Sequence, residues 1–212
     1  MPREQNRTGE RHEAASVESA KLENGFWRMQ GKISINDCLD NIWAVVSDYK
    51  GMLEIFPYLT AVRVVETEGT RNRLHTISKL KFPLGIRITS KTVLDYFEKN
   101  VVKMPNGKAR DLEFKLVEGD FESMIGRWSI EERSTPEGSP AVVDPKSVLE
   151  YTIELKPKPW IPFHLVEGKI VSMVVSNVIC VKKELERRAD CNGPTNKGHH
   201  KKLVDEKVDF HV

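Results

Sequence analysis

A long apolar helix near the C-terminal end limits most strongly what this chain can fold into. Three prolines within residues 157–162 end the preceding pattern, and a helix of about twenty residues is predicted to begin near Gly168. On a helical wheel its apolar side chains cover over half of the circumference, a stripe too wide for a helix lying on a flat surface. These side chains are Ile170, Val171, Met173, Val174, Val175, Val178, Ile179, Val181 and Leu185. We therefore expect a curved partner that wraps around this helix.

The preceding segment predicts such a partner. Residues 61–156 alternate apolar and charged side chains almost throughout, which is typical of antiparallel strands with one dry face and one wet face. Between residues 73 and 97 the even positions are apolar or small, Ile88 included, and are predicted to face inward. Asn106-Gly107 is a favoured hairpin turn, after which the inward alternation resumes.

The N-terminal part of the folded unit adds a strand and two short helices. Residues 26–35 are predicted to form the first strand. The apolar side chains of Leu39, Ile42, Trp43 and Val46 then follow the i, i+3, i+4, i+7 spacing of a helix, with Asn36 or Asp37 placed to cap it. Gly51 and Pro57 bound a second, shorter helical turn.

The two ends of the chain lack this periodicity. Residues 1–24 and 190–212 are polar and aperiodic, so they cannot bury enough apolar surface to offset the entropy lost on ordering. We predict a disordered leader over 1–24, one folded domain over 25–189, and a flexible tail over 190–212.

Composition excludes several classes of protein. The chain is 39% hydrophobic and 30% charged with a formal net charge of +2, which suits a soluble globular protein and gives no general attraction to nucleic acid. Its longest nearly uncharged apolar run, residues 170–181, is well short of the ~20 residues that span a bilayer. The start of the chain lacks the apolar segment of a secretory signal, and the three cysteines form no CxxC pair. We expect an intracellular, by default cytoplasmic, protein.

Signatures of catalysis or of a cofactor are missing from the sequence. It contains no nucleophile elbow, HExxH, GxGxxG or P-loop, so we assign no catalytic residue, no metal and no cofactor. His75 and His164 are interpreted as surface or capping residues, and His199 with His200 as solvated residues of the tail.

Asn177 is the polar residue that this interpretation must explain. It lies between Met173 and Ile170 on the otherwise dry face of the last helix. A buried amide must find partners or cost about 1 to 3 kcal/mol. It either bonds to the sheet or to a neighbouring Ser or Thr, or it anchors a carbonyl or hydroxyl of a bound ligand.

Three stretches, in this order, resemble the START-like polyketide cyclase/dehydrase and lipid-transport family of the SRPBCC superfamily, which includes the coenzyme Q-binding START-like proteins. They are "IWAVVSDYKGMLEIFPYL" (42–59), "FKLVEGDFESMIGRWSIEE" (114–132) and "PWIPFHLVEGKIVSMVVSNVICVKKELERR" (159–188). The resemblance implies an α+β helix-grip fold, in which a curved antiparallel sheet of about seven strands wraps around the C-terminal helix. Two short helices follow strand one.

The resemblance also implies a hydrophobic cavity between the sheet and the helix, where Val174 and Asn177 are expected to project from successive turns. Large aromatics in this position either line such a cavity or simply fill a core. The cavity candidates, which include the inward hydroxyls of the alternating strands, are Phe56, Thr76, Ser78, Leu80, Phe82, Ser90, Thr92, Phe114, Trp128, Tyr151, Met173, Val174 and Asn177.

Three functions stay open at this point. The first is binding or transport of a hydrophobic small molecule, such as a lipid, prenylquinone or polyketide-like compound. The second is a polyketide cyclase or dehydratase, which would need inward acids or bases that the pattern scarcely supplies. The third is a protein-interaction module that uses the apolar cavity entrance. The expected partner is a hydrophobic small molecule rather than nucleic acid, with transient membrane contact, and the resemblance allows a plastid or mitochondrion as the compartment.

Overall fold

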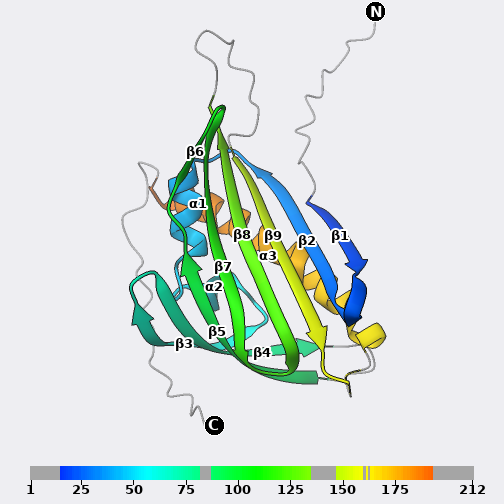
Figure 1. Cartoon of the computed structure of the whole chain (residues 1–212). Coiled ribbons are helices and arrows are strands. Elements are labelled where there is room, and N and C mark those ends of the chain that lie inside the picture. Colours follow the sequence, from blue (N-terminus) through cyan, green and yellow to red (C-terminus); the bar gives the residue numbers. More distant parts are fainter. Residues whose placement is uncertain (1–14, 82–86, 135–146, 160, 162, 193–212) are drawn as a thin grey trace, which may run out of the picture.

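A strongly curved antiparallel sheet wraps around one long helix in the computed structural model, which describes residues 15–81, 87–134, 147–159, 161 and 163–192 (Figure 1). The sheet order is β1-β2-β9-β8-β7-β5-β4-β3, and β6 pairs with β7. The strands are β1 Ser16–Lys21, β2 Trp27–Ile35, β3 Leu59–Glu68, β4 Arg71–Lys81, β5 Arg87–Glu98, β6 Val102–Met104, β7 Gly107–Glu118, β8 Phe121–Arg133 and β9 Ser147–Pro157. The helices are α1 Leu39–Val46, α2 Met52–Ile55 and α3 Phe163–Asn192.

Helix α3 crosses behind β8, β9 and β2, while the β3 and β4 end of the sheet curls underneath (Figure 1). The C-terminal part of α3 is tied to α1, because the Arg188 guanidinium donates to the Asp48 carboxylate (3.0 Å) and to the Ala44 carbonyl (3.3 Å). This arrangement confirms the predicted α+β helix-grip fold.

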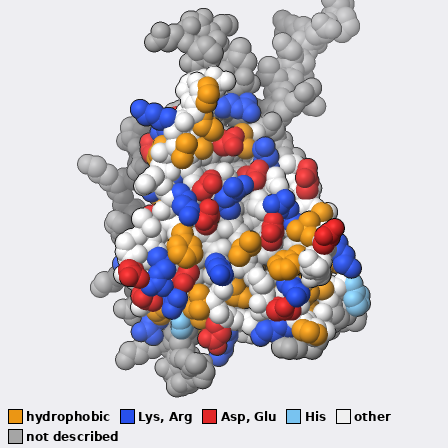
Figure 2. Space-filling view, in the orientation of Figure 1, with side chains coloured by type: hydrophobic (Ala, Val, Ile, Leu, Met, Phe, Trp, Pro, Cys, Tyr) orange, Lys and Arg blue, Asp and Glu red, His pale blue; other side chains and the backbone are white. Residues whose placement is uncertain are grey.

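The predicted alternation sets the two faces of the sheet. Leu74, Leu94, Leu112, Ile130 and Leu149 are all buried on the side that faces α3. Figure 2 shows the outer face, where Lys and Arg are interspersed with Asp and Glu and apolar side chains are scattered. The dry face of the sheet packs against α3, and the buried side chains of α1 and α2 complete the core.

The structure differs from the sequence prediction in the number of strands, at the start of the folded domain and at both ends of α3. The sheet has nine strands among the described residues rather than about seven, since the short β6 and the polar β1 both join it. β1 lies in the predicted disordered leader, so the leader prediction is wrong for residues 16–21. Helix α3 starts at Phe163, before the predicted Gly168, and continues past residue 189.

The first helix also differs in detail. Val45 is buried in α1, whereas Trp43 is only half-buried and carries the Arg110 guanidinium 3.4 Å from its ring centroid. The Leu39 N–H at the helix start donates to the Glu132 carboxylate (2.6 Å), so a side chain from β8 takes the capping role predicted for Asn36 or Asp37.

The alternation fails at Ile88, which is 40% exposed although it was predicted to face inward. The pairing of β5 with β7 ends at Val93 and Glu118, so among the described strands the first half of β5 pairs with β4 alone. Residues 87–89 at the start of that half are exposed.

Candidate ligand-binding site

A continuous line of aromatic rings crosses the space between the sheet and α3. The Trp128 and Tyr151 ring centroids lie 4.3 Å apart, and the Phe114 ring stacks on Tyr151 at 5.8 Å. The Phe114–Tyr151 separation is typical of favourable aromatic pairs, and the Trp128–Tyr151 pair is slightly closer. In order of contact the rings are Tyr58, Phe56, Trp128, Tyr151, Phe114, Tyr96 and Tyr49. These side chains fill much of the interior, so open space lies at its margins.

Asn177 is the polar group of this interior. Its side chain is 1% exposed, and its Oδ1 has no hydrogen-bond partner among the described residues. Burial raises the pKa of the Tyr58 and Tyr151 phenols, and the adjacent Asn177 amide lowers each pKa by a smaller amount. The phenols are therefore neutral at physiological pH, and one buried acceptor beside them is left unused.

A groove lies between α3 and the far end of β4. β4 continues past the first paired residue of β3, and the Lys79 N–H donates to the Tyr58 carbonyl (2.8 Å) there. We call this space, of about 300 Å³, the helix groove. Its lining residues are Pro57, Tyr58, Lys79, Leu80, Lys81, Lys169, Ser172, Met173 and Ser176.

The helix groove and Asn177 are adjacent. Lys169, Ser172, Met173 and Ser176 follow the i, i+3, i+4, i+7 spacing of one helix face, and Asn177 is the next residue along α3. Tyr58 both lines the groove and lies beside the Asn177 amide. The groove thus has apolar side chains from Leu80 and Met173, and Tyr58 separates it from the buried Asn177 amide.

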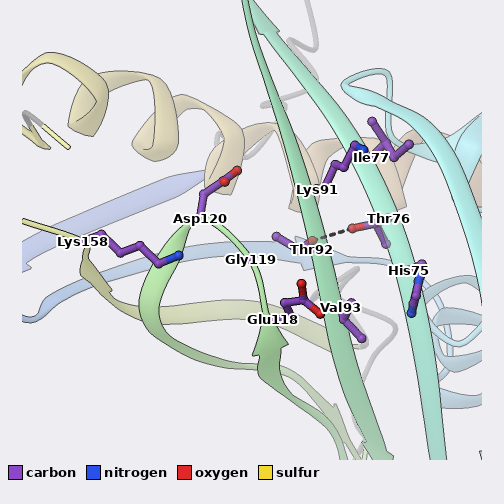
Figure 3. A pocket seen from close by; sticks show the side chains of 10 residues that line it. All are labelled: His75, Thr76, Ile77, Lys91, Thr92, Val93, Glu118, Gly119, Asp120 and Lys158. Carbon is purple, nitrogen blue, oxygen red and sulfur yellow. Dashed lines mark hydrogen bonds between the residues drawn. The ribbon is translucent and has the colours of Figure 1, made fainter. Parts of the chain in front are cut away.

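A second space, the β5–β7 hollow, opens where β5 separates from β7 (Figure 3). Its volume is about 290 Å³, and many of its lining side chains are charged. Thr76 and Thr92 point toward each other inside it, with their hydroxyl oxygens 2.6 Å apart. Since these two hydroxyls already bond to each other and four of the ten lining residues are Lys, Asp or Glu, this hollow suits an apolar molecule less well. Its lining residues are His75, Thr76, Ile77, Lys91, Thr92, Val93, Glu118, Gly119, Asp120 and Lys158.

The structure divides the predicted cavity residues into groups. The buried aromatic interior brings together Phe56, Phe114, Trp128, Tyr151 and Asn177. The helix groove contains Leu80 and Met173, whereas the β5–β7 hollow contains Thr76 and Thr92. Ser78 and Ser90 are half-buried cross-strand partners that line neither space. Phe82 lies outside the described residues.

Val174 is the candidate whose surroundings differ most from the expectation. It is fully buried against β2, where a Cβ on Gly31 would lie 3.1 Å from both the Val174 Cγ1 and its carbonyl oxygen. The structure therefore places Val174 against the sheet backbone and not in an open chamber. A ligand-binding role for the other candidates stays a prediction.

Sequence reasoning missed Tyr58 and three lysines of the groove. Tyr58 follows Pro57 in a stretch without periodicity, so no pattern indicated its direction. Lys79 and Lys81 occupy wet positions of an alternating strand, which normally face solvent. They line a groove because β3 begins too late to cover this end of β4.

The buried carboxylates of the described residues serve the fold. Asp95 accepts from Arg73 (2.6 Å), which lowers the pKa of that carboxyl, and Arg187 and Arg188 lower the pKa of Glu184 in the same way. No group of His, Cys, Asp and Glu in the described part of the chain could hold a metal ion. The site therefore offers shape, aromatic surface and one free acceptor.

None of the helices in the described part of the chain is long and apolar enough to cross a bilayer.

Comparisons with known proteins agree with this geometry. The model of the family described as polyketide cyclase/dehydrase and lipid transport matches residues 39–177. No curated protein has a significantly similar sequence. Human StAR-related lipid transfer protein 5 is similar in structure, with a TM-score of 0.61 at 12% identity, over 89% of this chain and 86% of that one.

Two bacterial structures are similar as well. A STAR-related lipid transfer protein from Xanthomonas axonopodis has a TM-score of 0.63 at 14% identity, over 82% of this chain and 94% of that one. The Zhui aromatase/cyclase from Streptomyces sp. R1128 has a TM-score of 0.58 at 15% identity, over 79% of this chain and 98% of that one. Similarity at these identities shows the shared fold.

Proposed function

This chain belongs to the polyketide cyclase/dehydrase and lipid transport family, and we propose that it binds and carries a small hydrophobic molecule in the helix groove. The volume of about 300 Å³ is at the lower end of the usual range for small-molecule sites. It suits a compact molecule, such as a fused ring system or a single short chain. The lipid-transfer proteins of the same fold are consistent with such a role.

The observation that carries the proposal is the unpaired Asn177 acceptor. A buried polar atom without a partner costs about 1 to 3 kcal/mol, so its presence on the dry face of α3 needs a reason. A ligand hydroxyl that donates to Asn177 Oδ1 supplies that reason. The neutral phenols of Tyr58 and Tyr151 beside it provide further hydrogen-bonding groups and aromatic surface.

The cyclase alternative draws its support from the family and from the aromatase/cyclase of the same fold. Such a reaction needs a group that takes up or gives a proton near neutral pH. Burial raises the pKa of Tyr58, Tyr96 and Tyr151 further from neutrality, and the buried carboxylates Asp95 and Glu184 are held by arginines. These facts favour a binding role over a catalytic one.

A pair of fluorescent ligands tests the role of Asn177. 2-Naphthol carries a hydroxyl donor, whereas 2-methoxynaphthalene has the same ring system without one. We expect the protein to bind 2-naphthol roughly 2 to 10 times more tightly, as one neutral hydrogen bond would give. In Asn177→Leu this preference should disappear while 2-methoxynaphthalene still binds.

Chemical denaturation provides the control for folding. Since leucine is similar in size and removes an unpaired polar atom, the free energy of unfolding of Asn177→Leu should be equal to or higher than that of the parent. If neither naphthalene binds to the parent protein, the carrier proposal is wrong. Equal affinity of the parent for both ligands would contradict the anchoring role of Asn177 alone.

A further inference from the structure

The rim of the helix groove has a composition that the binding of a neutral molecule does not explain. Lys79, Lys81 and Lys169 line it, and no Asp or Glu is among its described lining residues. We infer that the ligand of this groove is an anionic amphiphile whose charged group is held by these three lysines. This inference rests on the proposed function and adds the chemical class of the ligand.

The three lysines come from two elements and meet at one opening. Lys79 and Lys81 are on β4, Lys169 is on α3, and all three are exposed. None of them forms a salt bridge within the described residues, whereas Lys99, Lys108 and Lys156 elsewhere on the molecule bond to carboxylates at 2.8, 3.1 and 2.7 Å. Like charges that converge without a counter-ion repel one another, and an anion would relieve that repulsion.

The order of groups along the groove matches an amphiphile. Three exposed lysines line the groove together with the apolar side chains of Leu80 and Met173, and the buried Asn177 acceptor is one residue beyond the groove-lining Ser176 on α3. The carboxylate of an amphiphilic ligand would pair with the lysines, and its apolar body would contact Leu80 and Met173. A hydroxyl at its far end would donate to Asn177.

An anionic membrane surface could also attract these lysines. We favour a free small anion, because the lysines line a groove of about 300 Å³ that can enclose a compact ligand. A lipid with two long chains would exceed this volume. Lysines that only bind an anionic membrane surface need not line a groove.

Binding of 6-hydroxy-2-naphthoate, compared with 2-naphthol, tests the inference by calorimetry on the full chain. We expect the carboxylate to bind about fivefold or more tightly, because three exposed ion pairs each add a small factor. This preference should shrink as salt is raised, since salt screens exposed charges. In the double variant Lys79→Gln/Lys169→Gln, the ratio of the 6-hydroxy-2-naphthoate affinity to the 2-naphthol affinity should fall toward one.

The matched control is Lys32→Gln/Lys103→Gln. These two lysines are also exposed, but they lie on β2 and β6, which contribute nothing to the groove. The control variant should keep the full preference for the carboxylate. Equal loss in both double variants would mean that net charge alone matters and would overturn the inference.

The remaining outcomes separate the inference from the proposed function. If 2-naphthol binds but the carboxylate gains nothing, the ligand is not anionic and only the inference is wrong. If neither ligand binds, both the inference and the proposed function are wrong. Sedimentation with phosphatidylcholine vesicles, with and without phosphatidylserine, covers the membrane source. If Lys79→Gln/Lys169→Gln weakens only vesicle binding, the lysines serve a membrane and the inference is overturned.

Discussion

Gly126 on β8 gives the Phe114 ring the space that the aromatic interior requires. The two residues are register partners on neighbouring strands. A Cβ at position 126 would overlap the Phe114 ring and lie 2.6 Å from the Thr152 carbonyl oxygen. Without a side chain there, the Phe114 ring can lie over the β8 backbone and stack on Tyr151.

We therefore expect Gly126→Ala to destabilise the protein by about 1 to 3 kcal/mol in urea denaturation, which is typical of overpacking. Because Phe114 must move, the near-ultraviolet circular dichroism of the aromatic cluster should change as well. Gly168→Ala is the matched control, since a Cβ there meets nothing within 4 Å. Alanine also favours the helix at that position. Equal effects of the two substitutions would show that the space over Gly126 is not needed.

At the residue scale, alternation predicted the inward direction of many strand residues, with Ile88 as an exception. Phe114, Trp128 and Tyr151 are buried as their even or odd positions indicated. Alternation does not tell how a ring is accommodated, so the need for glycine at 126 could not be predicted. Nor could the direction of Tyr58, which depends on the turn after Pro57 and on no repeating pattern.

Among the elements, α3 determines which side of the interior stays open. Gly31 lets the helix approach β2 so closely that Val174 contacts the strand backbone. Met173, one residue earlier, is half-buried and lines the helix groove instead. Neighbouring residues of one helix thus face a closed side and an open side.

A pair of tryptophan substitutions tests this division. Val174→Trp should cost at least about 1 to 3 kcal/mol in the free energy of unfolding, because the site is fully packed. Met173→Trp should fill the groove, abolish 2-naphthol binding and leave the free energy of unfolding close to that of the parent. The family resemblance had led us to expect Val174 to project into an open cavity. If Val174→Trp proved stable and blocked binding, that prediction would be right and the packing against β2 wrong.

At the element scale, the sequence predicted the order of strands and helices but not every end. Glu23, Asn24 and Gly25 form the turn between β1 and β2, where Asn24 and Gly25 have φ angles of 59° and 78°. Asn-Gly favours such turns, and this pair could have indicated the hairpin. β1 itself gave no signal, because "SVESAK" buries no side chain and contributes mainly backbone hydrogen bonds.

In the whole molecule, the contacts that hold the ends are few and polar. Among the described strands, β1 pairs with β2 alone, and all six of its residues are exposed. Its Ser19 hydroxyl donates to the Glu167 carboxylate on α3 at 3.3 Å. At the other end, Arg188 provides the link from α3 to α1, and Asp190 and Cys191 beyond it are exposed. The apolar core therefore lies between residues 25 and 189.

We accordingly propose that the fragment 25–189 folds on its own, and expect it to unfold cooperatively in urea. The fragment keeps every residue of the buried core and the Arg188 contact with Asp48. A second fragment, 15–192, keeps β1 and the described end of α3, so the difference in free energy of unfolding between the two measures what β1 contributes. That difference should be small compared with the stability of the domain, because β1 buries no apolar side chain. If 15–192 unfolds cooperatively and 25–189 does not, the hairpin that β1 forms with β2 is a required part of the sheet, and the domain begins before residue 25.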